Sequence, residues 1–339
     1  MSDHGLPEAV PADLLESLAL EAWKELRPGP GVPARIDILK APSEPGRRGA
    51  CRLAGAGPEG APVIAKCCRP AKARVEHTIY VEVFPHLPCP TPRYYGLVEA
   101  KDGTSCWLFL EDVGAERYST ADAEHRRLAG RWLAALHTEA ARLALADRLP
   151  DRGPGHYLGR LRSARGRILD NLANPALTAA DLAVLRAIVA QCAALEARWH
   201  EVERFCAGLP RTVVHGDFVA KNVRVRTRPS GTALLPFDWS NAGWGVAAID
   251  LAQSPLRPSR FAGDPDLTAY GAVVREHWPG FDLGAIRRWG QLATLFRLLA
   301  ALAWSAFGLG QEWVERTMGA LGFYQTALDR ELQAAGWLS

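Results

Sequence analysis

Lysine is scarce in this chain, and no segment of it is strongly basic. Only six of the 40 basic residues are lysines, and the formal net charge is +3. The sequence contains no block of lysine and arginine of the kind that follows a nucleic-acid backbone. It therefore predicts no nucleic-acid partner, and the place of each lysine becomes informative.

Cysteine pairs and long uncharged apolar runs are also missing. The seven cysteines are an odd number without a C-x-x-C pair, which argues against a disulfide framework or a zinc site. No apolar signal segment opens the sequence, and its most apolar stretch, residues 292–309, is interrupted by Arg297. We therefore expect a cytoplasmic protein with reduced thiols and no membrane association, in which residues 292–309 form a buried helix.

Length and residue periodicity predict an α+β protein with two lobes. At 339 residues the chain exceeds the ~250–300 residues at which one core usually splits. Apolar residues at helical spacing predict an N-terminal helix over residues 13–26, short strand patterns follow it, and the chain becomes mainly helical from residue 119. The predicted parts are an N-terminal helical extension (1–31), a small β-rich N-lobe (32–113) and a large, mainly helical C-lobe (114–339).

Three polar side chains belong to one strand–loop–strand pattern. Residues 213–223 read as a strand, a polar loop and the start of a second strand, and a hairpin return ends on Asp238. Asp217 and Asn222 have the spacing of a kinase catalytic loop, in which the Asp accepts a hydroxyl proton and the Asn binds Mg²⁺. Because Mg²⁺ beside phosphates needs only one or two carboxylate ligands, we expect Asn222 and Asp238 to bind it and Asp217 to deprotonate the acceptor.

These motifs resemble those of the aminoglycoside phosphotransferase and choline kinase-like family, which has a protein kinase-like fold. The matching segments are His215-Gly216-Asp217 with Asn222, Asp238-Trp239, and Ile249-Asp250-Leu251-Ala252. As in that family, Gly replaces the Arg of the protein-kinase His-Arg-Asp motif, and an Asp followed by an aromatic residue replaces Asp-Phe-Gly. The resemblance implies ATP and Mg²⁺ as cofactors.

The resemblance also implies supporting roles around the catalytic loop. His215 would order the loop, and Asp250 would brace it from behind. Lys221, directly before Asn222, would either touch the transferred phosphate or pair with a surface acid.

A candidate for nucleotide positioning is Lys66, which ends an apolar strand pattern over residues 62–66. That is the arrangement in which a lysine reaches the α- and β-phosphates of ATP. The alternative is an edge-strand lysine that only improves solubility. A helix predicted over residues 71–84 offers Glu76 as the acid that would fix Lys66, with Glu82 as the alternative because Glu76 follows Lys66 closely for this fold.

Two further nucleotide contacts depend on loops. The turn over residues 40–48 lacks the G-x-G-x-x-G pattern that covers phosphates in kinases, so either Gly46 and Arg47 bind phosphates by charge or the turn is solvated. Residues 107–114 resemble the last N-lobe strand and the hinge. The resemblance places adenine contacts on the backbone of residues 110–112, that is Leu110, Glu111 and Asp112, with both acidic side chains facing solvent or capping a helix.

The helical half offers few chemical groups beyond the loop. Leu128, Trp132, Leu133, Leu136 and His137 form one apolar stripe, which predicts a helix under the catalytic loop with His137 as a satisfied core histidine. Two more helices are predicted over residues 157–172 and 180–206, the second begun by Thr178 or Asp181.

The only sequence features that bear on the acceptor are the charge and the aromatic content of residues 251–339. Residues 251–339 contain eight arginines and eight acids, a balance that argues against a polycationic aminoglycoside, whose charges need carboxylate partners. The same residues hold 12 of the 28 aromatic side chains, which suit flat, apolar or sugar-like ligands, although helix packing accounts for most of them.

We therefore predict an ATP- and Mg²⁺-dependent O-phosphotransferase that acts on a hydroxylated small molecule, an antibiotic or related natural product. One alternative is a housekeeping kinase for choline, a sugar or an amino alcohol. The other, from a different class, is a nucleotide-binding pseudokinase without catalysis. The absence of an Ala-Pro-Glu segment argues against a protein kinase, and no feature sets an oligomeric state.

Overall fold

The computed structural model describes residues 12–28, 32–41, 49–101, 103–229, 231–252, 264–334 and 336. The chain divides into two compact units, which take in Met1–Tyr118 with Lys221–Asn241 and Ser119–Ala220 with Ala242–Ser339. The N-terminal helix groups with the first unit. Residues 221–241, predicted to belong to the C-lobe, also group with the first unit.

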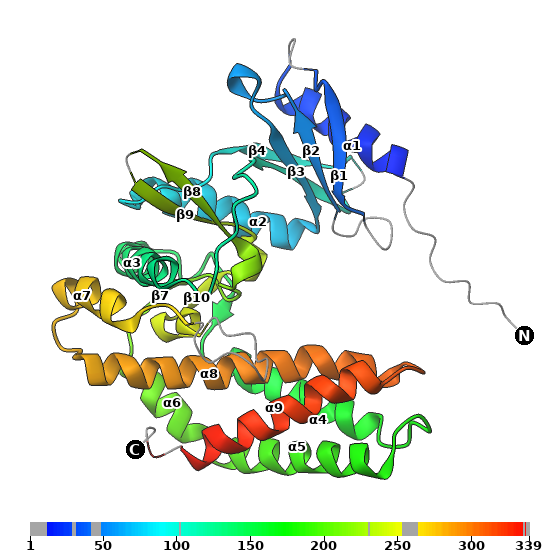
Figure 1. Ribbon diagram of the computed structural model, residues 1–339, viewed down its shortest axis with the longest axis vertical. Coiled ribbons are helices and arrows are strands. Elements are labelled where there is room, and N and C mark those ends of the chain that lie inside the picture. Colours follow the sequence, from blue (N-terminus) through cyan, green and yellow to red (C-terminus); the bar gives the residue numbers. More distant parts are fainter. Residues whose placement is uncertain are drawn as a thin grey trace, which may run out of the picture. The chain divides into compact units, whose positions relative to one another are not determined.

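The first unit is built on an antiparallel five-stranded sheet (Figure 1). Side chains along β2 and β3 alternate between buried and partly exposed, as the period of two in a strand requires when one face packs on a core. The strands in spatial order are β1 (Arg35–Lys40), β2 (Gly49–Ala54), β3 (Val63–Cys68), β5 (Cys106–Glu111) and β4 (Tyr94–Glu99).

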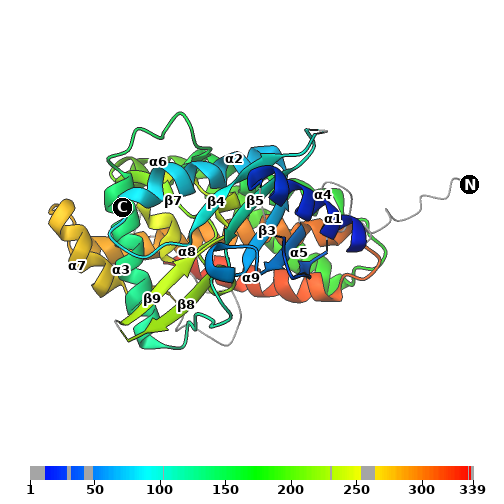
Figure 2. The ribbon, with the colours of Figure 1, turned by 90° about the horizontal axis from the view of Figure 1, so that it is seen from above.

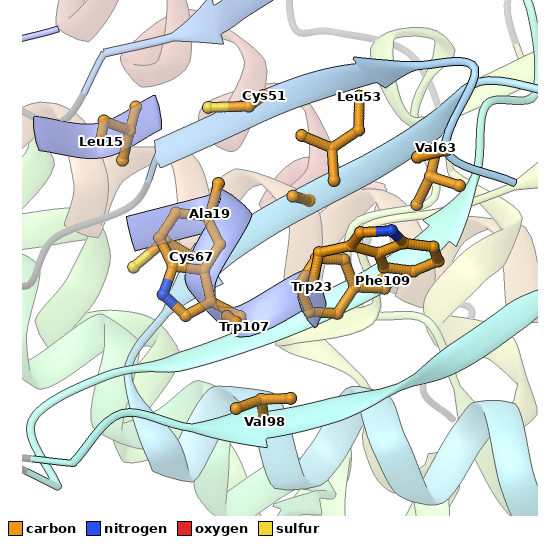
Figure 3. Packing of buried hydrophobic residues seen from close by; sticks show 13 residues of the cluster. Leu15, Ala19, Trp23, Cys51, Leu53, Val63, Cys67, Val98, Trp107 and Phe109 are labelled. Carbon is orange, nitrogen blue, oxygen red and sulfur yellow. The ribbon is translucent and has the colours of Figure 1, made fainter. Parts of the chain in front are cut away.

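Helix α1 (Ala12–Leu26) covers one face of this sheet and confirms the helix predicted over residues 13–26. Its Trp23 ring lies 5.1 Å from the ring of Phe109, centroid to centroid, within the cluster of buried side chains shown in Figure 3. Gly96 in β4 has φ 148°, and a Cβ there would lie 2.6 Å from Leu26. Glycine therefore lets the end of α1 approach the sheet.

Another helix, α2 (Pro70–Thr78), packs against β5 and β4 through a small cluster of Cys68, Ala73, Cys106 and Leu108. The helix predicted over residues 71–84 is thus shorter. It continues as a π turn, Ile79–Val83, and ends in a 3₁₀ turn, Phe84–His86. Apolar periodicity does not distinguish a π turn from an α-helical turn, which is why the sequence missed the change.

The first unit also contains the predicted hairpin, β8 (Val223–Arg228) and β9 (Gly231–Pro236). The two strands pair in antiparallel register from Val223 opposite Pro236 to Arg228 opposite Gly231. The backbone N–H of Val225 donates to the carbonyl of Glu116, which joins the hairpin to the segment after β5.

The second unit is mainly helical (Figures 1 and 2). It also contains a small sheet with the strand order β6-β10-β7. Its strands are β6 (Asp151–Arg152), β7 (Arg211–Val214) and β10 (Gly243–Val246). The helices are α3 (Ala123–Ala140), α4 (Pro154–Asp170), α5 (Ala179–Ala197), α6 (Trp199–Ala207), α7 (Leu267–His277), α8 (Leu283–Ser305) and α9 (Glu315–Gln333).

The helix predicted over residues 180–206 differs in detail from the structure. Thr178 caps α5, and Thr178 and Asp181 form a reciprocal capping box, so both residues named as possible starts contribute. The helix predicted over 180–206 is broken at Arg198, which is the C-cap of α5 and the N-cap of α6. No Gly or Pro marks this break, so the sequence did not reveal it.

Helix α8 confirms the predicted buried helix but begins earlier, at Leu283. In the described part of the chain, Leu283–Gly310 is long and apolar enough to cross a membrane by length and composition, yet more than half of its most apolar window is buried. It packs against α4 and α9, and the Phe296 ring stacks on Tyr157 of α4 at 4.0 Å between centroids. These contacts describe a core helix.

Candidate active site

Lys66 lies on an interior strand and contacts two carboxylates. Strand β3 sits between β2 and β5, so the edge-strand interpretation of Lys66 is wrong. Its Nζ donates to Glu76 Oε1 at 2.5 Å and to Asp238 Oδ1 at 2.7 Å. Glu76, and not the alternative Glu82, is therefore the acid of α2 that pairs with Lys66.

The pair lies in a strongly desolvated environment. Glu76 is completely buried, and this burial, with the Asp238 charge nearby, raises the pKa of the Glu76 carboxyl above its ordinary value against the opposing effect of Lys66. Burial opposes the charge on Lys66, but the adjacent carboxylates of Glu76 and Asp238 outweigh it and raise the pKa of Lys66. The Lys66 ammonium group is thus charged at neutral pH, and its hydrogen bonds to Glu76 and Asp238 hold it in place.

A second lysine holds the segment after Asp238. Lys72 Nζ, on the first turns of α2, donates to the Ser240 carbonyl at 2.6 Å and to Asn241 Oδ1 at 3.3 Å. It therefore ties α2, which carries Glu76, to this segment. Sequence reasoning assigned Lys72 no role, although its place in a lysine-poor chain was an available signal.

The two predicted metal ligands come together through the hairpin. Asn222 immediately precedes β8, and its carbonyl accepts the Phe237 N–H at 3.0 Å, which brings Asp238 beside the same end of the hairpin. Asp238 has φ 61°, a left-handed conformation that costs a non-glycine residue about 1–3 kcal/mol. Ser240 Oγ donates to Asp238 Oδ1 at 2.9 Å and helps to hold it.

The catalytic-loop motif follows β7 in the second unit. Gly216 adopts φ 72°, where glycine is favoured, and its N–H donates to Asp250 Oδ1 at 2.9 Å. The His215 N–H donates to Asp250 Oδ2 at 2.7 Å. Asp250 thus makes the backbone contacts that a brace of the loop requires.

Asp250 is itself anchored in the core. Its Oδ2 lies 3.3 Å from His137 Nε2, and His137 Nδ1 lies 3.0 Å from the Tyr270 hydroxyl. Burial alone would raise the pKa of the Asp250 carboxyl, but the His137 hydrogen bond and the nearby His137 and His215 hold that pKa below its usual value. His137 is buried and hydrogen-bonded, as expected of a satisfied core histidine.

Asp217 makes one contact that the sequence did not predict. Arg297 Nη1, on α8, lies 2.8 Å from Asp217 Oδ1, and both side chains are mostly buried. The Asp217 N–H lies 3.3 Å from His215 Nδ1, and Phe218 stacks on Trp132 of α3. The loop is thus held by α3, α8 and the segment around Asp250, consistent with the apolar stripe predicted to pack under it.

The proposed hinge residues are held by ion pairs. Glu111 accepts from Arg226 at 2.6 Å, and Asp112 pairs with Arg52 at 2.6 Å, so neither acid simply faces solvent or caps the following helix. The Glu111 N–H donates to Arg93 O, and the Asp112 N–H lies 3.4 Å from Pro62 O. The backbone N–H groups of both residues thus have carbonyl acceptors within the first unit.

The other residues predicted for the site are Leu110, Lys221, Gly46 and Arg47. Leu110 is buried in β5, opposite Ile64 and Tyr94. Lys221 is exposed in the 3₁₀ turn Ala220–Asn222, and its carbonyl accepts from Arg224. Gly46 and Arg47 lie outside the described residues.

These features define a class of protein. A five-stranded sheet with a Lys–Glu–Asp cluster, a His-Gly-Asp loop and an Asn before a hairpin are the parts of a small-molecule phosphotransferase with a protein kinase-like fold. The chain belongs to the phosphotransferase enzyme family, whose model matches residues 55–302. No curated protein sequence matches it significantly.

Solved structures of kinases with different kinds of acceptor share this fold. The microcompartment-associated aminopropanol kinase has a TM-score of 0.65 at 16% identity, covering 96% of this chain and 100% of that one. The GDP complex of wild-type aminoglycoside 2'-phosphotransferase-IIIa gives 0.62 at 12%, with 94% and 99% coverage. Choline kinase from Cryptosporidium parvum Iowa II gives 0.60 at 9%, with 96% and 98% coverage. At these identities the similarity establishes the α+β fold alone.

Proposed function

We propose that this protein is a cytoplasmic, ATP- and Mg²⁺-dependent O-phosphotransferase whose acceptor is a hydroxylated natural product such as an antibiotic. The observation that carries the proposal is the double contact of Lys66 with Glu76 and Asp238. A partly buried, charged lysine fixed by two acids is suited to hold the phosphates of a nucleotide.

The donor set beside Lys66 fits Mg²⁺. In the described ranges of the chain, no group of three or more His, Cys, Asp or Glu side chains is placed to hold a metal ion. Asn222 and Asp238 offer one amide and one carboxylate, and Mg²⁺ accepts such a pair when phosphates supply further oxygens. The bound ion would neutralise charge on the phosphates.

The chain's own residues divide the remaining tasks. Lys66 would orient the α- and β-phosphates, and Glu76 would keep Lys66 in place. Asp217 would align the acceptor hydroxyl and accept its proton, while Asp250 holds the loop through the His215 and Gly216 N–H groups. Since the transition state is loose, positioning and charge neutralisation would supply most of the rate enhancement.

Mass spectrometry of hydroxylated antibiotics and metabolites, incubated with the protein, ATP and Mg²⁺, tests this proposal. We expect one compound to gain the mass of a phosphoryl group, and Asp217→Asn to slow the transfer by about 10²–10⁴-fold, the usual size of base assistance. Undiminished transfer by the variant contradicts the role of Asp217. Nucleotide binding without transfer to any compound favours the pseudokinase alternative.

A housekeeping metabolite kinase remains the second candidate. An aminopropanol kinase, a choline kinase and an aminoglycoside phosphotransferase all share the fold, so the fold alone does not decide between the two candidates. Amino alcohols and choline in the same panel decide between the two, because the metabolite kinase would phosphorylate one of them in preference to every antibiotic.

A further inference from the structure

Arg297, on α8, places a positive charge beside Asp217, and this charge bears on which acceptor the enzyme takes. Arg297 follows Phe296, whose ring stacks on Tyr157 of α4 with an angle of 2° between the planes. The ring of Trp199, on α6, also stacks on the Phe296 ring, with 6.3 Å between the centroids. Arg297 therefore follows a residue that packs against aromatic rings of α4 and α6, and its Nη1 lies 2.8 Å from Asp217 Oδ1.

Two more arginines contribute to the electrostatic field in this region. Burial raises the pKa of the Tyr157 hydroxyl and Asp250 adds to this effect, whereas Arg152, Arg297 and Arg160 oppose it. Three guanidinium groups and one carboxylate therefore act on this one buried hydroxyl.

Arg152 is also held in place by its strand. It lies in β6 beside β10, and a Cβ at Gly243 would approach the Arg152 side chain to 2.5 Å. Glycine at this position leaves room for the arginine to lie across the strand. Burial lowers the pKa of Arg152, which reflects a desolvated guanidinium group.

The nearby acids are engaged elsewhere in the second unit. Asp250 accepts from the His215 and Gly216 N–H groups, and Asp151 pairs with Arg211. Glu196, on α5, pairs with arginines of α4. Each of these acids thus has its own donors, and the guanidinium group that contacts Asp217 is that of Arg297.

The reaction changes the charge of Asp217, which is the ionic partner of Arg297. In the transfer, the acceptor oxygen forms a bond to the γ-phosphorus, the bond from that phosphorus to the β,γ-bridging oxygen breaks, and ADP leaves with the electron pair. The hydroxyl proton passes to Asp217, which becomes neutral. Arg297 then loses its ionic partner at the moment when the acceptor lies within hydrogen-bond reach of Asp217.

We propose that Arg297 selects an acceptor that carries a carboxylate near the reacting hydroxyl, and that it disfavours amino alcohols. A carboxylate binds a guanidinium group through two parallel hydrogen bonds and replaces the charge that Asp217 gives up. An ammonium group in the same position would face Arg297 and the field of Arg152 and Arg160. The inference rests on the proposed phosphotransferase function and narrows its acceptor class.

Charge-matched acceptors test the inference. Each hydroxylated scaffold is offered as its carboxylate, its primary amide and its amine, with ATP and Mg²⁺, and kcat/KM is measured for each form. We expect the carboxylate to exceed the amide by about tenfold or more and the amine to be the poorest. Arg297→Met should abolish the preference of carboxylate over amide, whereas Arg297→Lys should retain it in part.

The ratio of kcat/KM for the carboxylate acceptor to that for the amide acceptor separates two roles of Arg297. If Arg297 only positioned Asp217, Arg297→Met would slow transfer to both acceptors equally and leave this ratio unchanged. Arg288→Met, at an exposed position on the same helix, is the matched control and should leave the ratio unchanged. Arg160→Gln, also exposed, should lower the ratio without affecting the fold.

Preferential transfer to amines, or no advantage of carboxylates in the wild type, overturns the inference while the phosphotransferase function stands. The function is judged separately, from nucleotide binding and from the effect of Asp217→Asn on any transfer observed.

Discussion

Glu76 and Glu82 both lie in the segment after β3, but Glu76 is the one that contacts Lys66. Comparing the effects of replacing each acid therefore tests the cluster of Lys66, Glu76 and Asp238. Glu76 is buried against Lys66, so Glu76→Gln would leave the ammonium group with a single carboxylate partner in a desolvated place. We expect kcat/KM for ATP to fall by roughly 10–100-fold, about 1.4–2.7 kcal/mol of transition-state stabilisation. Glu82→Gln should change it less than twofold. Equal losses in the two variants would contradict the assignment of Glu76.

Asp250 predicts how stability depends on pH. Its pKa in the folded protein is lowered, so its contribution to the free energy of unfolding is present above the unfolded pKa near 4 and is lost as pH falls through the folded value. Asp250→Asn should cost about 3 kcal/mol at pH 7, because the amide keeps one acceptor oxygen and turns its NH2 donors toward either the His215 or the Gly216 N–H group.

Urea denaturation of both proteins between pH 7 and pH 3 measures this effect. The difference between wild type and Asp250→Asn should shrink steadily in acid, whereas Asp147→Asn, at an exposed position, should show no comparable trend. A difference that stays constant with pH would mean that the carboxylate charge at position 250 does not stabilise the fold.

Several site residues could be predicted from the sequence because their signals are local. Asp217 and Asn222 share one loop, and Lys66 belongs to an apolar strand pattern, although β3 continues past it to Cys68. Arg297 and Lys72 contact residues that are distant in sequence, 80 and 168 positions away for the contacts with Asp217 and Ser240. Such contacts depend on how α8 and α2 pack, and no local pattern reports that.

Helix α4 and strand β10 contain glycines with opposite roles. Gly159 is in the interior of α4, and a Cβ there would meet no atom within 4 Å. Gly159→Ala should therefore stabilise the protein by about 0.5–1 kcal/mol through reduced backbone entropy in the unfolded chain. In Gly243→Ala, the new Cβ would lie 2.2 Å from the Pro150 carbonyl oxygen, and we expect a loss of about 2 kcal/mol or more from this overpacking.

Chemical denaturation of the two variants beside the wild type checks both signs. If Gly243→Ala were neutral, β6 and β10 would have room to separate, and the tight placement of Arg152 would be wrong. The comparison is informative because both glycines look alike in the sequence, where neither the helix nor the short strand indicates which one is crowded.

The elements themselves could be predicted where periodicity is strong. The N-terminal helix, the hairpin and the buried helix at α8 follow from regular apolar spacing and clear turn residues. The π turn after α2 and the break at Arg198 carry no Gly or Pro of their own. Both are set by packing, so a one-dimensional pattern could not place them.

The division of the whole chain into two units separates the proposed tasks. Lys66, Asn222 and Asp238 belong to the first unit, and Asp217 belongs to the second. The sequence predicts a lobe boundary near residue 113, and order along the chain does not report the hydrogen bond that joins the hairpin to the residues after β5.

This separation predicts where nucleotide binding stabilises the protein. A ligand that binds only the folded state adds about 2.7 kcal/mol at a concentration 100 times its Kd. With a non-hydrolysable ATP analogue and Mg²⁺, we expect hydrogen-exchange protection in β3, α2 and residues 221–241. Because Asp238 would bind the metal and Asp217 would act only on the acceptor, Asp238→Asn should lose most of this protection and Asp217→Asn should keep it. The opposite pattern, with protection dependent on Asp217 and independent of Asp238, would reverse the proposed roles of the two carboxylates.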